Sequence, residues 1–286
     1  MSVNRSDLRT SLRDLLGAWP DFTTTVAEAL DATETGVDLA AVTNLAERSL
    51  IEVDSEVMRT ISISSLTATV MRGDKGTTAA THSNGATAKF YPNWGWSDVH
   101  LNRQIEKAIS WLGEGMVWSL VPVTNTWLAD AKQFGLTSGD EYPNGNIVKR
   151  IELWDENLGA AGDYREILGW RHIGDRIELN QQLTENTAVR LWVQRKQALL
   201  TDDSTNLDND KYREPLVNRA AGLCLDELLA NRTRFYEYSA TLNDRASTPD
   251  ELQRTAYYFK NQALIERDGI SRPGLSGFAA IQRPGL

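Results

Sequence analysis

Histidine and cysteine supply many catalytic and metal-binding side chains, and this chain has few of them. It contains three histidines, His82, His100 and His172, and one cysteine, Cys224. None of the histidines has a cysteine, a second histidine or a carboxylate at the spacing of zinc ligands. The nucleophile elbow, the phosphate-binding loop and the dinucleotide-binding glycine motif are also missing from the sequence. The sequence therefore predicts no catalytic residue, no metal site and no bound cofactor.

Cys224 is expected to be structural. It lies in an apolar segment, residues 220–230, where a thiol usually behaves as a small buried hydrophobic group. A reactive nucleophile would need an electropositive, accessible setting instead. A single cysteine excludes an intramolecular disulfide, which fits synthesis in a reducing cytoplasm.

An acidic segment, residues 202–210, could in principle bind calcium. An EF-hand loop needs glycine at its sixth position and glutamate at its twelfth. Counting from Asp202, those positions hold Leu207 and Arg213, so the motif fails. We therefore expect a solvated acidic loop, and its candidate functional residues are Asp202, Asp203, Asp208 and Asp210.

Composition limits the classes of partner. The chain has 286 residues and a net charge of −9, with a pI near 5.0, so no overall positive field attracts nucleic acid or acidic lipid. The N-terminus has no apolar signal region, and no apolar stretch approaches the ~20 residues of a membrane span. We expect a soluble protein without membrane contact. Nine tryptophans hint at large surfaces buried against partners.

The N-terminal half predicts two helices and a β-rich module. Leucines at helical spacing indicate a helix from residue 7 to about 18. Residues 23–90 contain several short β-rich segments separated by turn-forming residues. We interpret them as a small β-barrel-like module. An apolar stripe from Leu101 to Leu112 indicates a strong helix over residues 96–111, with Ser97 as its N-cap. Residues 116–145 are expected to be irregular.

Alternating polar and apolar positions over residues 147–195 predict a four-strand antiparallel meander. Pro215 is expected in the first turn of a helix over residues 216–231. Thr248, Pro249 and Glu251 form a capping box that begins another helix, which Asp268-Gly269 is expected to end.

The last segment, residues 269–286, is predicted to be extended and not helical. Four glycines loosen it, and Pro273 and Pro284 oppose helix formation. Apolar residues recur every three to five positions, as in segments that become ordered in a partner's groove. The alternative is an unstructured terminus. The candidate partner-binding residues are Ile270, Arg272, Leu275, Phe278, Ile281, Arg283 and Leu286.

Several segments resemble virion proteins of tailed bacteriophages. Residues 56–60, 66–73, 76–82 and 85–86 are similar to a module found in adaptors and in tail-fibre and baseplate proteins. The segments Trp96-Ser97-Asp98 and 102–108 resemble the core helix of the head-to-tail adaptor family. The likeness continues through the predicted meander, residues 199–203 and 214–229, and spans roughly residues 24 to 265 by pattern.

The resemblance implies a structural virion protein at the head–tail neck, assembled in the host cytoplasm. Adaptors of this family form a dodecameric ring beneath the portal, complete the DNA-filled capsid and carry the next neck protein (the stopper) or the tail. The expected partners are therefore the portal protein, that next component and further copies of this chain. Genomic DNA would pass through the channel without specific binding. Residues 202–210 are a candidate acidic lining of that channel, with a position on the outer surface of the ring as the alternative. The C-terminal segment is expected to dock on the portal.

The predicted fold class is α+β, with a helical body resembling an adaptor helix bundle. Two alternatives for the function stay open: a tail-tip, baseplate or other minor tail protein, and a carbohydrate-cleaving virion enzyme. The enzyme would need two carboxylates about 5–10 Å apart in a cleft. The predicted organisation is residues 1–22, an N-terminal helix; 23–92, the β module; 93–120, the core helix; 121–201, the meander; 212–268, C-terminal helices; and 269–286, an extended docking tail.

Overall fold

The chain forms two compact units, which are described separately. Unit 1 consists of Met1–Leu112 and Leu199–Leu286, and unit 2 of Gly113–Ala198. The computed structural model describes residues 2–271 apart from 115–117, 129–130, 132, 136–146, 159–161, 174–175, 181–182, 184 and 242–247.

Unit 1 contains a curled six-stranded antiparallel sheet, a half-barrel. The strand order is β1-β6-β3-β4-β5-β2. The two edge strands approach each other where they end, because Val26 and Leu39 form an isolated bridge and the Ala27 amide donates to the Asp38 carbonyl over 2.7 Å. The strands are β1 (Phe22–Thr25), β2 (Gly36–Asp38), β3 (Leu50–Val53), β4 (Glu56–Ser64), β5 (Thr67–Met71) and β6 (Thr87–Tyr91).

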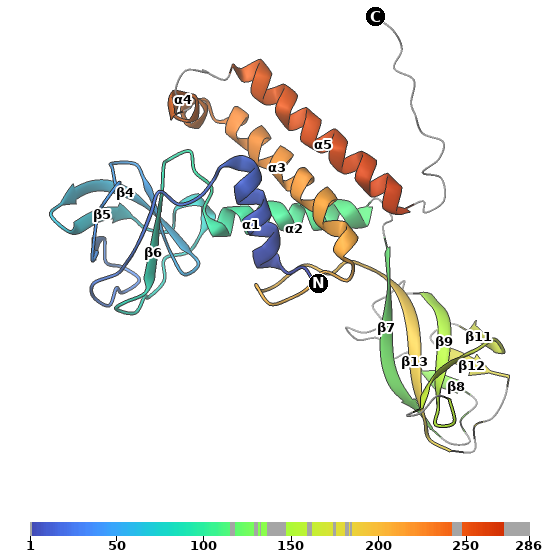
Figure 1. The fold of residues 1–286 in the computed structure, drawn as a ribbon. Helices are drawn as coiled ribbons and strands as arrows, with labels where there is room; N and C mark the ends of the chain where they lie inside the picture. Colours follow the sequence, from blue (N-terminus) through green and yellow to red (C-terminus); the bar gives the residue numbers. More distant parts are fainter. Residues whose placement is uncertain are drawn as a thin grey trace, which may run out of the picture. The chain divides into compact units, whose positions relative to one another are not determined.

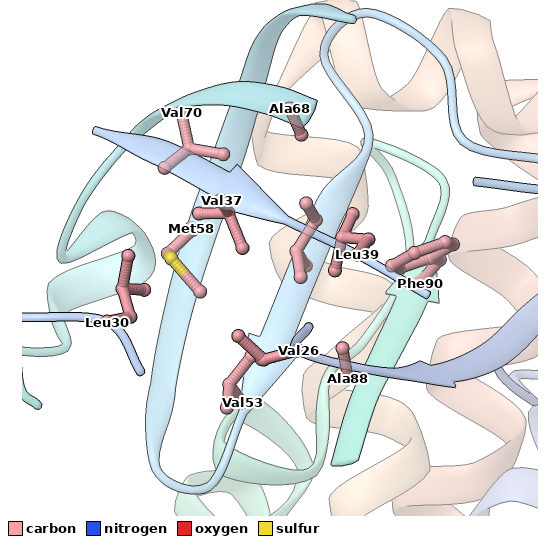
Figure 2. Packing of buried hydrophobic residues seen from close by; sticks show 11 residues of the cluster. Val26, Leu30, Val37, Leu39, Val53, Met58, Ala68, Val70, Ala88 and Phe90 are labelled. Carbon is pink, nitrogen blue, oxygen red and sulfur yellow. The ribbon is translucent and has the colours of Figure 1, made fainter. Parts of the chain in front are cut away.

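The concave side of this sheet holds its hydrophobic core. Figure 2 shows Val37, Met58 and Val53 directed toward one another, with Leu30 entering from a loop. All are at most 1 % exposed. Full burial of one such side chain contributes roughly 1.5–3 kcal/mol, so this cluster holds the curled sheet together.

Five helices occur among the described residues (Figure 1). Local signals begin several of them: the Ser97 hydroxyl accepts from the His100 amide, and Thr248 and Glu251 complete the expected capping box. Helices α3 and α5 lie antiparallel, since Asn218 pairs with Glu266 and Asp226 with Lys260. The helices are α1 (Arg5–Leu16), α2 (Asp98–Glu114), α3 (Arg213–Ala230), α4 (Arg232–Thr241) and α5 (Pro249–Ser271).

Buried charges attach α1 and α2 to the sheet. The Glu52 carboxylate of β3 accepts from the amides of Asp98 and Val99, both 2.9 Å away, at the beginning of α2. Arg13 of α1 donates to the Asp98 carboxylate over 2.6 Å and to the Tyr91 hydroxyl over 3.0 Å. Burial and the nearby Asp98 charge raise the pKa of Glu52. This network fixes the beginning of α2 against the sheet and against α1.

Unit 2 is built from strands. One sheet has the order β10-β9-β13-β7 and a second the order β11-β12-β8. Both contribute to one core, with Ile151, Val189 and Leu191 fully buried beside Ile177. The strands are β7 (Trp118–Trp127), β8 (Gln133–Gly135), β9 (Ile147–Asp155), β10 (Asp163–Ile167), β11 (Trp170–Ile173), β12 (Arg176–Leu179) and β13 (Thr187–Lys196).

The predicted fold class is wrong in its main statement. Helices do not form the dominant body: the molecule is mixed α/β, and the curled six-stranded sheet is as prominent as the five helices among the described residues. The sequence pattern located the helices individually but gave no measure of how much sheet they would pack against. Long-range contacts such as Glu52 to Asp98 make sheet and helices one unit.

The predicted meander is also wrong in the position of its last strand. Strand β13 pairs with β9 and β7, whereas β11 and β12 belong to the other sheet. Strand β7 lies in the segment expected to be irregular. A meander would place β13 next to β12, because segments adjacent in sequence often pair, but the long β7 offers β13 a ten-residue antiparallel register.

The C-terminal helices differ from expectation in two respects. Helix α5 continues through Gly269 to Ser271, because a helix interior tolerates one glycine at a cost of about 1 kcal/mol. Helix α4 was not predicted, although Asn231 is a recognisable N-cap whose side chain accepts from the Arg234 amide.

Candidate functional site

The acidic loop binds to the N-terminal helix of its own chain. The Asp203 carboxylate pairs with Arg5 over 3.0 Å and with Arg9 over 2.7 Å. The hydrogen bond from Arg9 lowers the pKa of Asp203 to about 2. Asp202 accepts from the amides of Ser204 and Thr205 instead, which shapes the turn.

The end of this loop is tied down as well. The Asp210 carboxylate accepts from the Val3 amide over 3.2 Å, and the Leu207 amide donates to the Val3 carbonyl. Asp208 is half-buried and also has an interaction partner. The structure therefore gives the predicted acidic residues a clear intramolecular role, and a channel-facing role stays a prediction.

Most of the predicted docking tail lies outside the described residues. Ile270 is half-buried in the last turn of α5, so the helical part of the chain reaches further than expected. Arg272, Leu275, Phe278, Ile281, Arg283 and Leu286 lie outside the described part of the chain.

Helix α5 carries two apolar faces. Leu252, Ala256 and Ala263 are buried on the face toward α3. A second set at helical spacing is exposed, with Tyr258 at 62 % and Ile265 at 68 %. We call this set the α5 stripe; it consists of Tyr257, Tyr258, Leu264 and Ile265.

The α5 stripe was not predicted from the sequence, although the spacing of its residues is visible there. Positions 257, 258, 264 and 265 repeat after seven residues, which places them on one side of a helix. A helix of a soluble domain normally has one apolar stripe and a polar opposite face. The second stripe is thus a surface without a partner among the described residues, and it fits contact with another protein.

His82 belongs to a buried polar cluster. Its Nδ1 lies 2.7 Å from the Asp54 carboxylate and its Nε2 lies 3.0 Å from the Glu56 carboxylate. Arg72 also binds Glu56 through two nitrogens, each 2.7 Å from an oxygen. Both ring nitrogens are occupied by carboxylates on opposite sides, so His82 cannot serve as a free base. Its role here is structural.

The other two histidines do not form a site with it. His100 Nε2 lies 3.1 Å from the Glu227 carboxylate, and His172 is in β11, paired with Ile177. Within the described residues, no group of three histidine, cysteine, aspartate or glutamate side chains could hold a metal ion. Cys224 is fully buried, and burial raises the pKa of its thiol, as for a structural cysteine.

One pocket contains several carboxylates. It has a volume of about 490 Å³ and is lined in part by Asp7, Asp210 and Glu214. Asp7 accepts from the Asn4 amide over 3.0 Å as part of the α1 capping box, and Asp210 accepts from Val3. Since two of the three acids hold the N-terminal segment in place, the arrangement offers little support for glycoside cleavage.

Comparison with known proteins identifies no relative: the chain matches no family model and no curated protein. Among the described helices, none combines the length and the apolar character that a bilayer crossing requires.

Proposed function

We propose that this protein is a structural virion component, a head-to-tail adaptor. In this proposal, copies of the chain form a ring beneath the portal, complete the DNA-filled capsid and carry the next neck protein or the tail. The observation that carries the proposal is the exposed α5 stripe. The resemblance of residues 24–265 to the adaptor family supports the same function.

The stripe favours a permanent protein contact over a catalytic role. Aromatic side chains bury large areas at low conformational cost and are enriched where proteins associate. Tyr257 and Tyr258 are each more than 60 % exposed, and Leu264 and Ile265 extend the surface by two helical turns. A second copy of the chain or a neighbouring neck protein would remove this surface from water.

The charge of the chain is compatible with a DNA channel. A net charge of −9 per copy multiplies around a ring, and an acidic lumen repels phosphate groups. DNA would then slide past without binding. Arg5 and Arg9 neutralise Asp203, so the acidic loop would contribute less to such a lumen than its composition indicates.

The test is assembly of a double variant, Tyr258→Asp with Ile265→Asp. Two carboxylates on the stripe should prevent ring formation and incorporation into virions, while thermal unfolding changes little because both positions are exposed. Leu168→Asp is the matched control, since Leu168 is 88 % exposed and lies in unit 2. Incorporation is measured by complementation and by protein analysis of purified particles.

Electron microscopy of particles that carry the wild-type protein completes the test. A ring directly beneath the portal supports the proposal. Density at the distal end of the tail would assign the chain to the tail tip or baseplate instead. Cleavage of a host polysaccharide by the purified protein, or normal assembly of the double variant, would contradict it.

A further inference from the structure

A basic pocket of about 190 Å³ lies between the six-stranded sheet and the beginning of α4. It is separate from the α5 stripe and does not depend on the proposed ring. None of its lining side chains, all in the described part of unit 1, is a carboxylate. We call it the Arg234 pocket; its walls include Arg48, Arg59, Lys75, Asn231, Thr233 and Arg234.

Arg234 contributes a buried guanidinium group to the wall. Its side chain is 4 % exposed, and its Nη1 donates to Glu227 over 3.0 Å while Nη2 donates to the Trp94 carbonyl over 2.9 Å. Its buried Nε has no hydrogen-bond partner. The guanidinium group is held in place by its bonds to Glu227 and to the Trp94 carbonyl, and it adds a positive charge to the pocket wall.

Lys75 adds positive charge to the same space. Its φ of 53° is in the left-handed region, which holds the residue in a tight turn between its neighbours. Burial, together with the nearby charges of Arg234 and Arg59, lowers the pKa of Lys75 to about 8. Crowded cations of this kind favour an anion among them.

Each of the three arginines in the wall has a carboxylate partner, including Arg234 with Glu227. Arg59 pairs with Asp74 over 2.8 Å and Arg48 with Glu237 over 3.1 Å, both outside the lining of the pocket. The Arg48 side chain is 56 % exposed, so one side of the pocket is open to an entering ligand. The charged groups that line the pocket are therefore all cationic, while the paired carboxylates lie outside its lining.

The beginning of α4 adds to this positive field. Asn231 caps the ten-residue helix by accepting from the Arg234 amide over 3.1 Å. The first amides of a helix carry partial positive charge and bind anions. Thr233 in the first turn contributes a hydroxyl group that can donate to an oxyanion.

We propose that the Arg234 pocket binds a phosphate group, either as inorganic phosphate or as the terminal phosphate of a small monoester. Guanidinium groups, an ammonium group and helix amides are the donors that proteins use for phosphate. Sites for drug-sized molecules measure roughly 300–1,000 Å³, so a pocket of about 190 Å³ suits the phosphate group and not a whole nucleotide.

The first experiment measures protection of Lys75 in the full-length protein. At pH 8 a large part of this amine is neutral, so an amine-reactive reagent should label it faster than an ordinary lysine. Inorganic phosphate should slow the labelling of Lys75 at least about fivefold, because a bound dianion favours the charged amine. Lys107, exposed on α2, is the internal control and should be unaffected, with chloride at equal ionic strength as the reference.

The second experiment measures affinity by calorimetry with inorganic phosphate and with ribose 5-phosphate. Lys75→Gln should weaken binding at least about tenfold, Lys75→Arg should retain most of it, and Lys107→Gln should not change it. Binding of both probes assigns the site to terminal phosphates, and binding of inorganic phosphate alone assigns it to the free ion. Equal protection by chloride, no measurable binding, or equal losses in the Lys75 and Lys107 variants would overturn the proposal.

Discussion

Glu56 shows how one buried acid organises a loop. Its carboxylate has no solvent exposure and accepts from Arg72, from His82 and from the amides of Gly73 and Ala80. All four donors belong to the segment between β5 and β6. This segment has no hydrophobic cluster of its own in the described structure, so the carboxylate holds it against β4.

Glu56→Gln is expected to lower the free energy of unfolding by about 3 kcal/mol at pH 7, because it leaves the Arg72 charge buried without its partner. Asp54→Asn, which alters the 61 % exposed partner of His82, should cost less than about 1 kcal/mol. Denaturant unfolding of both variants measures the difference. Similar losses in the two variants would contradict the assigned role of Glu56.

The same carboxylate predicts a pH dependence. Burial opposes its ionisation, but the bonds from Arg72, Ala80, His82 and Gly73 outweigh burial and lower its pKa to about 2 from an ordinary 4.5. Between these values the unfolded chain binds a proton that the folded chain does not. The contribution of the ionised Glu56 to the free energy of unfolding is therefore complete above pH 4.5 and is lost as the pH falls toward 2. Glu56→Gln should flatten the measured fall in stability between pH 5 and pH 3.

At the scale of elements, close packing of α3 on α5 depends on a glycine. A Cβ atom at Gly222 would lie 2.6 Å from Lys260 Cγ and 3.1 Å from the Ala256 carbonyl oxygen. Lys260 is held by its ion pair with Asp226, and the carbonyl is part of the α5 backbone. The two helices would have to separate slightly to accept a methyl group.

Gly222→Ala should therefore lower the free energy of unfolding by about 1 kcal/mol. The cost of overpacking, roughly 1–3 kcal/mol, exceeds the gain in helix propensity of about 1 kcal/mol. Gly269→Ala in α5 is the matched control, because a Cβ there meets no atom within 4 Å. In the control, the free energy of unfolding should rise by up to about 1 kcal/mol. Thermal unfolding of both variants is the measurement, and stabilisation by both would show that the helices are not in tight contact.

At the scale of the whole molecule, each of the two units has a hydrophobic cluster of its own among the described residues. One fills the curled sheet of unit 1 and the other lies between the two sheets of unit 2. Units with cores of their own can unfold independently. Calorimetry should then resolve two transitions.

Leu191→Ala in unit 2 and Met58→Ala in unit 1 assign those transitions. Both side chains are fully buried, so each substitution should cost roughly 2–5 kcal/mol in its own unit. Each variant should shift one transition to lower temperature and leave the other in place. A single transition that moves equally in both variants would mean that the units unfold together.

Local features of the fold were predictable from the sequence. The capping box at Thr248 and the N-cap at Ser97 act within four residues, so their helices begin where the pattern indicates. The alternation of Val189, Leu191 and Val193 with polar residues likewise indicates the buried face of β13. Short-range periodicity and capping depend only on neighbours along the chain, which makes them readable without tertiary information.

Tertiary structure decided strand pairing, the balance of sheet and helix, and the candidate sites. Strand β13 pairs with β7, about 70 residues earlier, and not with the nearer β12, because pairing depends on register and a shared core. Helix α5 has two apolar stripes, and only packing against α3 decides which one stays exposed. The Arg234 pocket joins residues from Arg48 to Arg234. Its charge density arises only when distant segments meet, so no sequence spacing could indicate it.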